Sequence, residues 1–479
     1  MISILRNSRG LLPRTPGRYR LGIRSFGNID PPFKDDLTPM DDDLFNLQDF
    51  QQYKESPDVL KRMERLLTPV DTANVIPEEQ HTSTAETLES SATLKQPVVF
   101  VSKLSNPYTN LALEDYIYNK IPKPDDQNNP YTRLMFYINS PCVVIGKNQN
   151  PWKEVNLPLL NSLHIPLVRR RSGGGTVVHD AGNVNFSFMT SKQKFDRFTF
   201  AELVVNAVNS AENNSPVLKV NERGDIVTEE DSFKVSGSAY KISRGKSYHH
   251  GTMLLNSRLD ILGKLLHRDV SKLGSVDAMA SISSVRSPVT NIEISSEEFI
   301  DSVSQAFGKK YAESVQLTEM ETKEENDHNE MFNLSDFVLA GTDETVETTI
   351  HTKTVIIDDT TEIPQEVVEE AQKLKEWSWC FGSTPKFSHE LSHESLNFKI
   401  KFYIDKHAVL DDFELSFLGE SPLSEEVITE SFAFLKQVIE EGRNKPVEER
   451  LKYTGSSVAG FVTNDMISDW IGECIDGTI

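Results

Sequence analysis

Hydrophobic and polar positions follow recognisable patterns from Pro97 onward, where the run VVFVS predicts a strand. A helical period follows over 106–119, in which Glu114 and Asp115 are predicted to lie on the exposed side. The segment Val184–Met189 alternates strictly and predicts another strand. Further strands are predicted at 133–138, 142–146, 165–169, 225–228, 233–240 and 248–255, and helices at 200–211, 257–267 and 297–312.

A second ordered region begins at Pro364, after a stretch that has no helical or strand period. Residues 318–362 are rich in Glu, Asp and Thr, which is typical of an inserted linker. Beyond them the pattern predicts a helix to Lys375, strands at 396–404 and 408–417, and a long helix over 423–441. The chain is therefore predicted to be α+β, with a large domain at 96–317, a disordered acidic linker at 318–362 and a small α+β C-terminal domain at 363–479.

The first 95 residues are predicted to lie outside the folded domains. Residues 1–29 carry six arginines, no lysine and no acidic residue, with serines and short apolar groups between them. This composition is typical of a mitochondrial transit peptide, although a solvated basic tail is the alternative. Residues 30–95 are acidic and polar and are predicted to form a disordered spacer. The expected location is the mitochondrial matrix.

Composition argues against several classes of function. With 72 acidic and 50 basic residues, the formal net charge is -22, which disfavours a general affinity for nucleic acid or anionic membranes. The chain lacks a long apolar run, so we expect no ordinary membrane-spanning helix. The cysteines Cys142, Cys380 and Cys474 match no zinc or CxxC spacing and are predicted to be reduced thiols packed as small apolar residues.

The most informative segment runs from Arg169 to Asp180 and reads RRRSGGGTVVHD. Each glycine costs roughly 0.5–1 kcal/mol relative to alanine in a regular element, so three in a row indicate a backbone that something approaches closely. Their N–H groups can bind an anion, and the adjacent arginines supply donors suited to a carboxylate or a phosphate. The run matches neither the P-loop nor the GxGxxG pattern, and a tight hairpin turn is the alternative interpretation.

Two more segments contain candidate chemistry. Lys234 begins the segment KVSGSAYK, whose small residues leave room for its ammonium group to meet negative charge on a phosphate or a carbonyl oxygen. A lysine that is merely exposed is the alternative. The adjacent His249 and His250 point to opposite faces of a strand and cannot easily bind one metal, which favours a structural role. The patterns HExxH and GxSxG are absent, so nothing indicates a zinc protease or a serine hydrolase.

Together these segments resemble the lipoate–protein ligase A family, in the long form that carries a C-terminal accessory domain. The resemblance follows the family's order through NPYTNLALEDYI (106–117), VVIGKNQNPWKEVN (143–156), RRRSGGGTVVHDAGNVNFSFM (169–189), ERGD (222–225), KVSGSAYK (234–241), HHGTMLLN (249–256), SVRSPVTNI (284–292) and WSWCFGSTPKFSHEL (377–391). It implies a biotin/lipoate protein ligase-like fold, related to class II synthetases, with a mixed sheet and flanking helices. Arg171 and Gly224 depart from the family pattern, where a small residue and Asn are more frequent.

The resemblance also implies a two-step reaction, in which lipoate and Mg-ATP give lipoyl-AMP and a lysine ε-amine of a carrier domain then takes the acyl group. Lys234 and Arg170 are the expected catalytic residues, with Lys234 touching both the acyl carbonyl and the α-phosphate. The expected binding residues are Ser172, Gly173, Gly174, Gly175, Val177, Val178, His179, Asn183, Asp225, His250 and Thr252. Among these, Val177 and Val178 would offer backbone atoms to adenine, and Asn183 and Asp225 are the candidates for Mg²⁺, which prefers oxygen ligands.

Three functions remain open at this point. The first is the ATP-dependent ligase, and the second is an ATP-independent acyltransferase that takes a lipoyl or octanoyl group from a carrier-protein or CoA thioester. Cys142 precedes an apolar strand without an activating neighbour, which disfavours a covalent cysteine mechanism. The third is a non-catalytic protein that binds carriers. The resemblance implies the glycine cleavage H protein or the acyltransferase subunits of 2-oxoacid dehydrogenases as partners.

Overall fold

The computed structural model describes residues 87–122, 131–211, 215–326 and 352–478, all within one compact unit that spans Phe45–Ile479. The predicted transit peptide at 1–29 and most of the predicted spacer at 30–95 lie outside these residues. A search of the described helices for a span that could cross a bilayer finds none. The predicted α+β architecture, with a mixed sheet and flanking helices, is confirmed.

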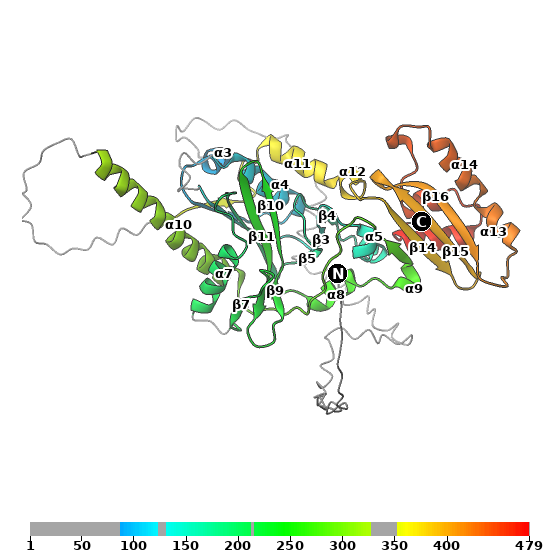
Figure 1. Cartoon of the computed structure of the whole chain (residues 1–479), viewed down its shortest axis with the longest axis horizontal. Coiled ribbons are helices and arrows are strands. Elements are labelled where there is room, and N and C mark those ends of the chain that lie inside the picture. Colours follow the sequence, from blue (N-terminus) through cyan, green and yellow to red (C-terminus); the bar gives the residue numbers. More distant parts are fainter. Residues whose placement is uncertain (1–86, 123–130, 212–214, 327–351, 479) are drawn as a thin grey trace, which may run out of the picture. The chain divides into compact units, whose positions relative to one another are not determined.

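The principal sheet has six strands in the order β10-β11-β6-β2-β1-β13, and its strands β10 and β11 lie side by side in Figure 1. Their bounds are β1 Val98–Ser102, β2 Arg133–Tyr137, β6 Asn183–Ser191, β10 Ser238–Ser243, β11 Lys246–Leu254 and β13 Lys353–Ile357. β1 pairs in parallel with both β2 and β13, whereas β2, β6, β11 and β10 pair antiparallel. The sheet is therefore mixed, and its long strands β6 and β11 lie near the middle.

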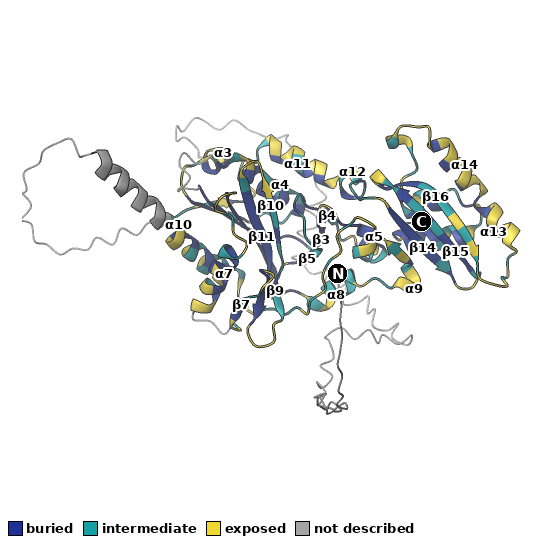
Figure 2. Cartoon of the chain, in the orientation of Figure 1, coloured by how far each residue is buried: buried dark blue, intermediate teal, exposed yellow. Residues whose placement is uncertain are grey.

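Helices cover both faces of this sheet, which explains why its inner strands β1, β2, β6 and β11 are buried along most of their length, whereas the outer strands β10 and β13 are partly exposed (Figure 2). Along β1, Val98 and Phe100 pack in a core with α4 (Pro107–Lys120) and α11 (Gln365–Lys375), while Val99 packs in a second core with α7 (Thr199–Ser210) and α10 (Ser296–Asn326). Successive side chains of a strand point to opposite faces, so one apolar strand serves both cores.

The prediction that Glu114 is exposed is wrong, because this residue is only 2% exposed. In α4, Glu114 lies three residues after Leu111 and three before Ile117, both of which are buried. Residues three apart share a helix face, so the carboxylate faces the protein interior. Its hydrogen-bond partners there are described with the candidate site.

Two small sheets lie beside the principal sheet and carry the chemically interesting loops. The first has the order β4-β3-β5, with β3 Cys142–Ile145, β4 Leu167–Arg169 and β5 Val177–His179. The second has the order β7-β8-β9, with β7 Leu218–Val220, β8 Ile226–Thr228 and β9 Lys234–Ser236. The predicted strand at 233–240 is thus two strands, because the chain passes from β9 to β10 at Gly237 and changes sheets there.

The C-terminal region is built on a sheet of order β12-β14-β15-β16, with β12 Ser275–Asp277, β14 Phe387–His393, β15 Phe398–Asp405 and β16 Val409–Phe417. Strand β14 was not predicted. The helices of this region are α13 Glu425–Ser431, α14 Ala433–Gly442, α15 Gly455–Ala459 and α16 Asp465–Ile475. The single helix predicted at 423–441 is wrong, because the chain leaves helical geometry at Phe432, where φ is -100° and ψ is 0°.

The remaining helices are short: α3 Leu88–Ala92, α5 Pro151–Glu154, α6 Leu157–Ser162, α8 Leu259–Leu266, α9 Val270–Leu273 and α12 Trp377–Cys380, with 3-10 turns η2 Lys406–Ala408 and η3 Val447–Glu449. Ordered elements also enter the segments predicted as spacer and linker. α3 lies within 30–95, and α10 and β13 occupy both ends of 318–362. β13 is ordered because it completes the edge of the principal sheet beside β1. The domain limits themselves stay a prediction.

One hydrophobic cluster joins residues before 317 with residues after 363. Trp152 of α5 is 2% exposed and stacks on Phe387 of β14 with ring centroids 4.9 Å apart. Phe381 and Tyr453 lie 5.4 and 5.6 Å from the same indole ring. The strand β12 adds a backbone connection, because it pairs with β14. The C-terminal region therefore shares a core with the rest of the described chain.

We expect Trp152→Ala to lower the free energy of unfolding by about 3–5 kcal/mol, the usual cost of a large aromatic cavity. Thermal unfolding followed by circular dichroism would measure this loss. Phe434→Ala is the control, because Phe434 is 48% exposed and should cost much less. Equal melting temperatures for the Trp152 variant and the wild type would contradict the shared core.

Candidate active site

The glycine run is held by the buried side chain of Arg170, which is 5% exposed. Its guanidinium donates to the carbonyl oxygens of Gly173 at 2.7 Å, Gly175 at 2.7 Å and Val144 at 3.2 Å, and its Nε also reaches Ser172 Oγ at 3.0 Å. Burial lowers the pKa of Arg170 to about 10, so the side chain keeps its charge at neutral pH. Arg170 thus positions the run through its backbone carbonyls.

This arrangement leaves the other backbone groups of the run available. The N–H groups of Gly173, Gly174 and Gly175 have no acceptor among the residues that the structure describes. Gly174 has a φ of 89°, in the left-handed region that glycine adopts without strain. Successive N–H groups in such a turn form an anion-binding concavity. The run is therefore prepared to receive a carboxylate or a phosphate oxygen.

The glycine run packs so closely against the end of β3 that a glycine is needed there as well. A Cβ on Gly146, which follows β3, would lie 2.1 Å from the carbonyl oxygen of Gly174. Gln149 and Ser284 support the run from the other side. Gln149 Oε1 accepts from Gly146 N at 2.8 Å and from Thr176 Oγ1 at 3.0 Å, while Ser284 Oγ accepts from Thr176 N at 2.9 Å. These three residues were not singled out from the sequence.

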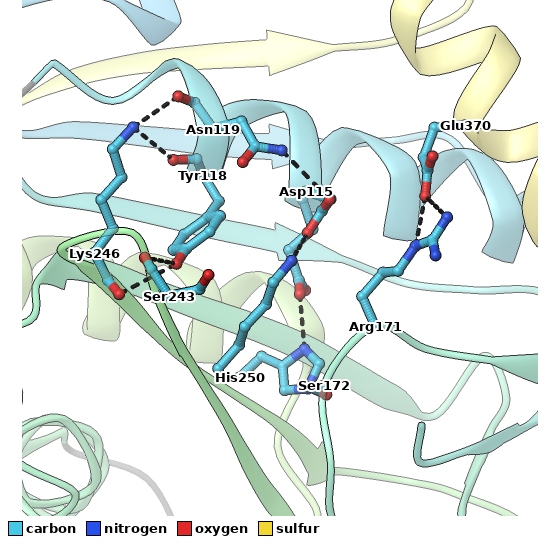
Figure 3. A network of polar contacts seen from close by, with 11 residues as sticks. Asp115, Tyr118, Asn119, Arg171, Ser172, Ser243, Lys246, His250 and Glu370 are labelled. Carbon is cyan, nitrogen blue, oxygen red and sulfur yellow. Dashed lines mark hydrogen bonds and ion pairs between the residues drawn. The ribbon is translucent and has the colours of Figure 1, made fainter. Parts of the chain in front are cut away.

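The arginines on either side of Arg170 hold a different part of the chain. Arg169 is fully buried and donates to the carbonyl oxygen of Cys380 at 2.7 Å and to Thr384 Oγ1 at 2.8 Å. Arg171 forms an ion pair with Glu370 (Figure 3), and its guanidinium carbon lies 3.8 Å from the centre of the Trp379 ring. The arginine triplet therefore connects the glycine run to the segment 370–384.

Lys234, at the start of β9, forms an ion pair with Asp225, with Nζ and Oδ1 2.9 Å apart. The Lys234 side chain is 21% exposed and that of Asp225 is 11% exposed, so both can meet a ligand from solvent. Asp225 is fixed by its backbone N–H, which donates to Asn221 Oδ1 at 3.0 Å. The structure thus brings together these two predicted site residues.

Gly237 brings Lys234 next to the strand that follows the glycine run. A Cβ built on Gly237 would lie 3.5 Å from Val177 Cγ1, 3.4 Å from Thr252 Oγ1 and 3.9 Å from Lys234 Cε. The N–H of Gly237 donates to Thr252 Oγ1 at 3.1 Å, and the N–H of Thr252 donates back to the Gly237 carbonyl at 3.0 Å. Val177, Lys234 and Thr252, all predicted site residues, therefore surround one point of the backbone.

Val177 and Val178 belong to β5, which pairs antiparallel with β3 and is the edge strand of its sheet. An edge strand has backbone N–H and C=O groups on one side that do not take part in the ladder. This geometry suits the recognition of a planar heterocycle by backbone atoms, the role expected for these residues.

His250 lies beside Ser172 (Figure 3) and is also hydrogen-bonded to Glu114. Its Nε2 is 2.7 Å from Ser172 Oγ, and its Nδ1 is 2.7 Å from Glu114 Oε1. Ser172, His250 and Glu114 are 2%, 7% and 2% exposed. Glu114 was not predicted at the site, although its position on the apolar face of the helix was a signal that could have identified it.

His179 is also buried, but its surroundings keep it neutral. Its Nδ1 lies 3.0 Å from Asn139 Nδ2, and burial, together with the nearby charge of Arg170 and His250, lowers its pKa to about 3. Asp180 follows it and accepts from the N–H groups of Gly182 at 2.9 Å and Arg258 at 2.8 Å. His179 and Asp180 therefore fix the turn after β5.

A magnesium site is not assembled by the protein alone. Among the described residues, no group of three or more His, Cys, Asp or Glu side chains is arranged to hold a metal ion. Asn183, at the start of β6, is fully buried, and its Oδ1 has no hydrogen-bond partner in the described chain. Mg²⁺ in nucleotide sites takes one or two protein oxygens plus phosphates and water. The free Asn183 oxygen fits that need, whereas Asp225 is bonded to Lys234.

The three cysteines are free and buried, as predicted. Burial raises the pKa of Cys142 above its usual range and raises that of Cys380 to about 12. A nucleophilic cysteine requires a thiolate. None of these residues is therefore suited to form an acyl-enzyme.

Comparisons with known proteins give a family for this site. The profile of the lipoyl protein ligase A/B catalytic domain matches residues 106–308. The chain is 35% identical over 307 residues to a putative lipoate-protein ligase A of Schizosaccharomyces pombe, covering 64% of this chain and 76% of the relative. It is 34% identical over 323 residues to the human mitochondrial lipoyl amidotransferase LIPT1, covering 65% of this chain and 74% of the relative.

Other relatives match over a shorter region. A putative lipoate-protein ligase A of Saccharomyces cerevisiae (strain RM11-1a) is 44% identical over 232 residues, which is 47% of this chain and 54% of the relative. The chain thus spans about half the length of this Saccharomyces cerevisiae relative. Among solved structures, Plasmodium falciparum LipL1 in complex with lipoate is similar, with a TM-score of 0.44, 23% identity and coverage of 78% of this chain and 98% of that one.

We expect Gly146→Ala to loosen the glycine run, because the new methyl group would overlap the Gly174 carbonyl oxygen. Hydrogen exchange of the 172–176 peptide should become faster while exchange in α14 stays unchanged. Gly442→Ala is the control, since a Cβ there meets nothing within 4 Å. Unaltered exchange in the first variant would contradict the close approach.

Stability should also fall as the pH decreases below 6.5, because unfolded histidines then bind protons that buried His179 does not accept until the pH approaches 3. This single group accounts for about 2 kcal/mol between pH 7 and pH 5. Urea denaturation at both pH values should therefore show a smaller pH-dependent loss for His179→Gln than for the wild type. The same loss in both proteins would show that His179 titrates normally.

Proposed function

The chain belongs to the lipoate–protein ligase A family, and from this premise we propose that it activates lipoate with Mg-ATP and transfers the lipoyl group to a lysine of a carrier domain. The observation that carries this proposal is the run Gly173–Gly175, whose N–H groups have no acceptor in the described part of the chain and which leads into Val177, beside Lys234. A non-catalytic carrier-binding protein would have no use for this arrangement.

In the first step a lipoate carboxylate oxygen attacks the α-phosphorus of ATP, and pyrophosphate leaves. Two anions must approach each other, so the site has to supply positive charge and N–H donors where they meet. We assign the carboxylate to the glycine amides and the α-phosphate to Lys234, which would exchange its partner Asp225 for the phosphate. Arg170 contributes its buried charge and keeps the loop in place.

We assign the adenine ring to the exposed backbone edge of β5 at Val177 and Val178, with Thr252 fixing Gly237 beneath the phosphate. A bound Mg²⁺ would neutralise phosphate charge, with Asn183 Oδ1 as one ligand and Asp225 as a second once Lys234 has exchanged it for the phosphate. His179 contributes by shaping the loop between β5 and β6.

In the second step the ε-amine of a carrier lysine attacks the acyl carbonyl carbon. The C–N bond forms, the C–O bond to phosphate breaks, and AMP leaves with the electron pair. Lys234 is again suited to stabilise the oxyanion that develops.

An acyltransferase is the second candidate, and one observation favours it: the human relative is named a lipoyl amidotransferase. In that reaction a lipoyl or octanoyl thioester replaces the adenylate, and Lys234 would polarise its carbonyl. The buried cysteines argue against a cysteine-bound intermediate in such a reaction.

We further propose that the protein works in the mitochondrial matrix, because its first 29 residues resemble a transit peptide and the human relative is mitochondrial. The proposed acyl acceptors are the glycine cleavage H protein and the acyltransferase subunits of 2-oxoacid dehydrogenases.

The deciding experiment incubates the full chain with apo carrier domain and offers either lipoate plus Mg-ATP or an acyl thioester without ATP. Mass spectrometry of the carrier should show a lipoyl addition only with ATP if the chain is a ligase. Addition only with the thioester would establish the transferase instead. No addition under either condition would contradict both.

Lys234→Ala should reduce the rate at least roughly 100-fold, the usual effect of removing one electrostatic stabiliser. Lys219→Ala is the matched control, because Lys219 lies on β7 of the same small sheet and its Nζ donates to the Glu229 carbonyl oxygen at 2.9 Å, away from Asp225. Near wild-type turnover in the Lys234 variant would contradict the role assigned to that residue.

A further inference from the structure

Ser172, His250 and Glu114 form a continuous chain of hydrogen bonds that has no role in the two proposed reaction steps. Each link is 2.7 Å long, and all three side chains are buried. The residues come from three separate parts of the chain, namely the glycine run, β11 and α4. A proton relay consists of a nucleophile or proton carrier, a base and a carboxylate that orients the base. Ser172, His250 and Glu114 follow this order.

The surrounding hydrogen bonds favour one set of proton positions in this line. Glu114 accepts from Tyr137 Oη at 3.0 Å through its other oxygen, so its carboxylate is well placed to accept the Nδ1–H of His250. The Nε2 of His250 is then the acceptor, and Ser172 Oγ–H donates to it. Arg170 Nε also donates to Ser172 Oγ at 3.0 Å, so the buried guanidinium helps to hold this oxygen beside His250.

His250 of the relay lies on the same face of β11 as Thr252, another proposed site residue. His250 and Thr252 are two residues apart on β11 and so point to the same side, about 7 Å apart by strand geometry. Thr252 holds Gly237, which lies against Lys234. The relay is therefore connected to Lys234 through Thr252 and Gly237.

Aminolysis of an acyl donor needs a proton acceptor, because the attacking amine must lose a proton as the amide forms. We propose that Ser172 takes this proton from the incoming amine and passes its own hydroxyl proton to His250, with Glu114 as the positioning residue that holds the imidazole. This inference rests on the proposed function and deepens it. It applies equally to an adenylate and a thioester donor, since both reactions end in attack by the same amine.

Atoms and charges balance in this step. The nitrogen forms a bond to the acyl carbon, the leaving group departs with its electron pair, and His250 becomes an imidazolium beside the Glu114 carboxylate. The imidazolium then returns the proton to the leaving group or to solvent. The charged or titratable groups around His250 are Glu114, Arg170, His179, Tyr137 and Tyr248, and only the carboxylate favours the imidazolium.

A second serine–histidine pair, formed by His249 of β11 and Ser238, can be compared with the relay. His249, on the opposite face of β11, pairs with Ser238 through Nε2 and Oγ 2.9 Å apart, but its Nδ1 has no partner among the described residues. Burial lowers the pKa of His249 to about 3. A serine–histidine pair without a carboxylate thus occurs beside one that has it, and Ser238 is the matched control for Ser172.

The test measures single-turnover acyl transfer to apo carrier, with the acyl donor that the wild type uses, as a function of pH. Ser172→Ala and His250→Gln should each lower the transfer rate roughly 100-fold, the low end of general-base contributions, with little change in KM for the carrier. Glu114→Gln should lower the rate and move the acid limb of the profile to lower pH, because loss of the carboxylate disfavours the imidazolium. Glu114→Asp should recover part of the rate.

Ser238→Ala should transfer at the wild-type rate, and melting temperatures establish that each variant folds. If the wild type acylates the carrier but the Ser172, His250 and Glu114 variants keep its rate and pH profile, the relay is wrong while the proposed function stands. An acyl adduct on Ser172 itself would overturn the relay in favour of a covalent intermediate. Failure of the wild type with every donor would instead refute the proposed function.

Discussion

The candidate site depends on one buried cation, the guanidinium of Arg170, and on the carbonyl oxygens that it holds. Burying an arginine is costly unless its N–H groups are hydrogen-bonded, and here Gly173, Gly175, Val144 and Ser172 satisfy them. Because the carbonyls of Gly173 and Gly175 bind Arg170, the N–H groups of the glycine run, which have no acceptor among the described residues, are left for a ligand. The same side chain also contacts Ser172, so it links the anion-binding backbone to the serine–histidine–glutamate line.

The neighbouring arginines connect this loop to the C-terminal region. Arg169 is bound to Cys380 and Thr384, and Arg171 to Glu370 and Trp379. Arg170 therefore holds the glycine run, whereas its neighbours Arg169 and Arg171 bind the C-terminal region. A loop held from both sides keeps its geometry before a ligand binds, which reduces the reorganisation needed during catalysis.

Much of this could be read from the sequence, since the glycine run, Lys234 and the strand beginning at Pro97 all carry strong local signals. Other features depend on tertiary contacts. Glu114 appeared exposed because a carboxylate usually is, and only its partners His250 and Tyr137 make its burial favourable. Strand β13 follows an acidic stretch and is recognisable only beside β1. The break at Phe432 interrupts a pattern whose residues otherwise favour one helix.

In the proposed reaction, the run Gly173–Gly175 and Lys234 hold the two sides of one acyl group. A crystal structure of the chain with a non-hydrolysable lipoyl-adenylate analogue would show whether they do. The acyl carbonyl oxygen should lie within hydrogen-bond distance of the glycine amides or Lys234 Nζ, with the adenine against β5. An analogue bound away from both the run and Lys234 would contradict this arrangement.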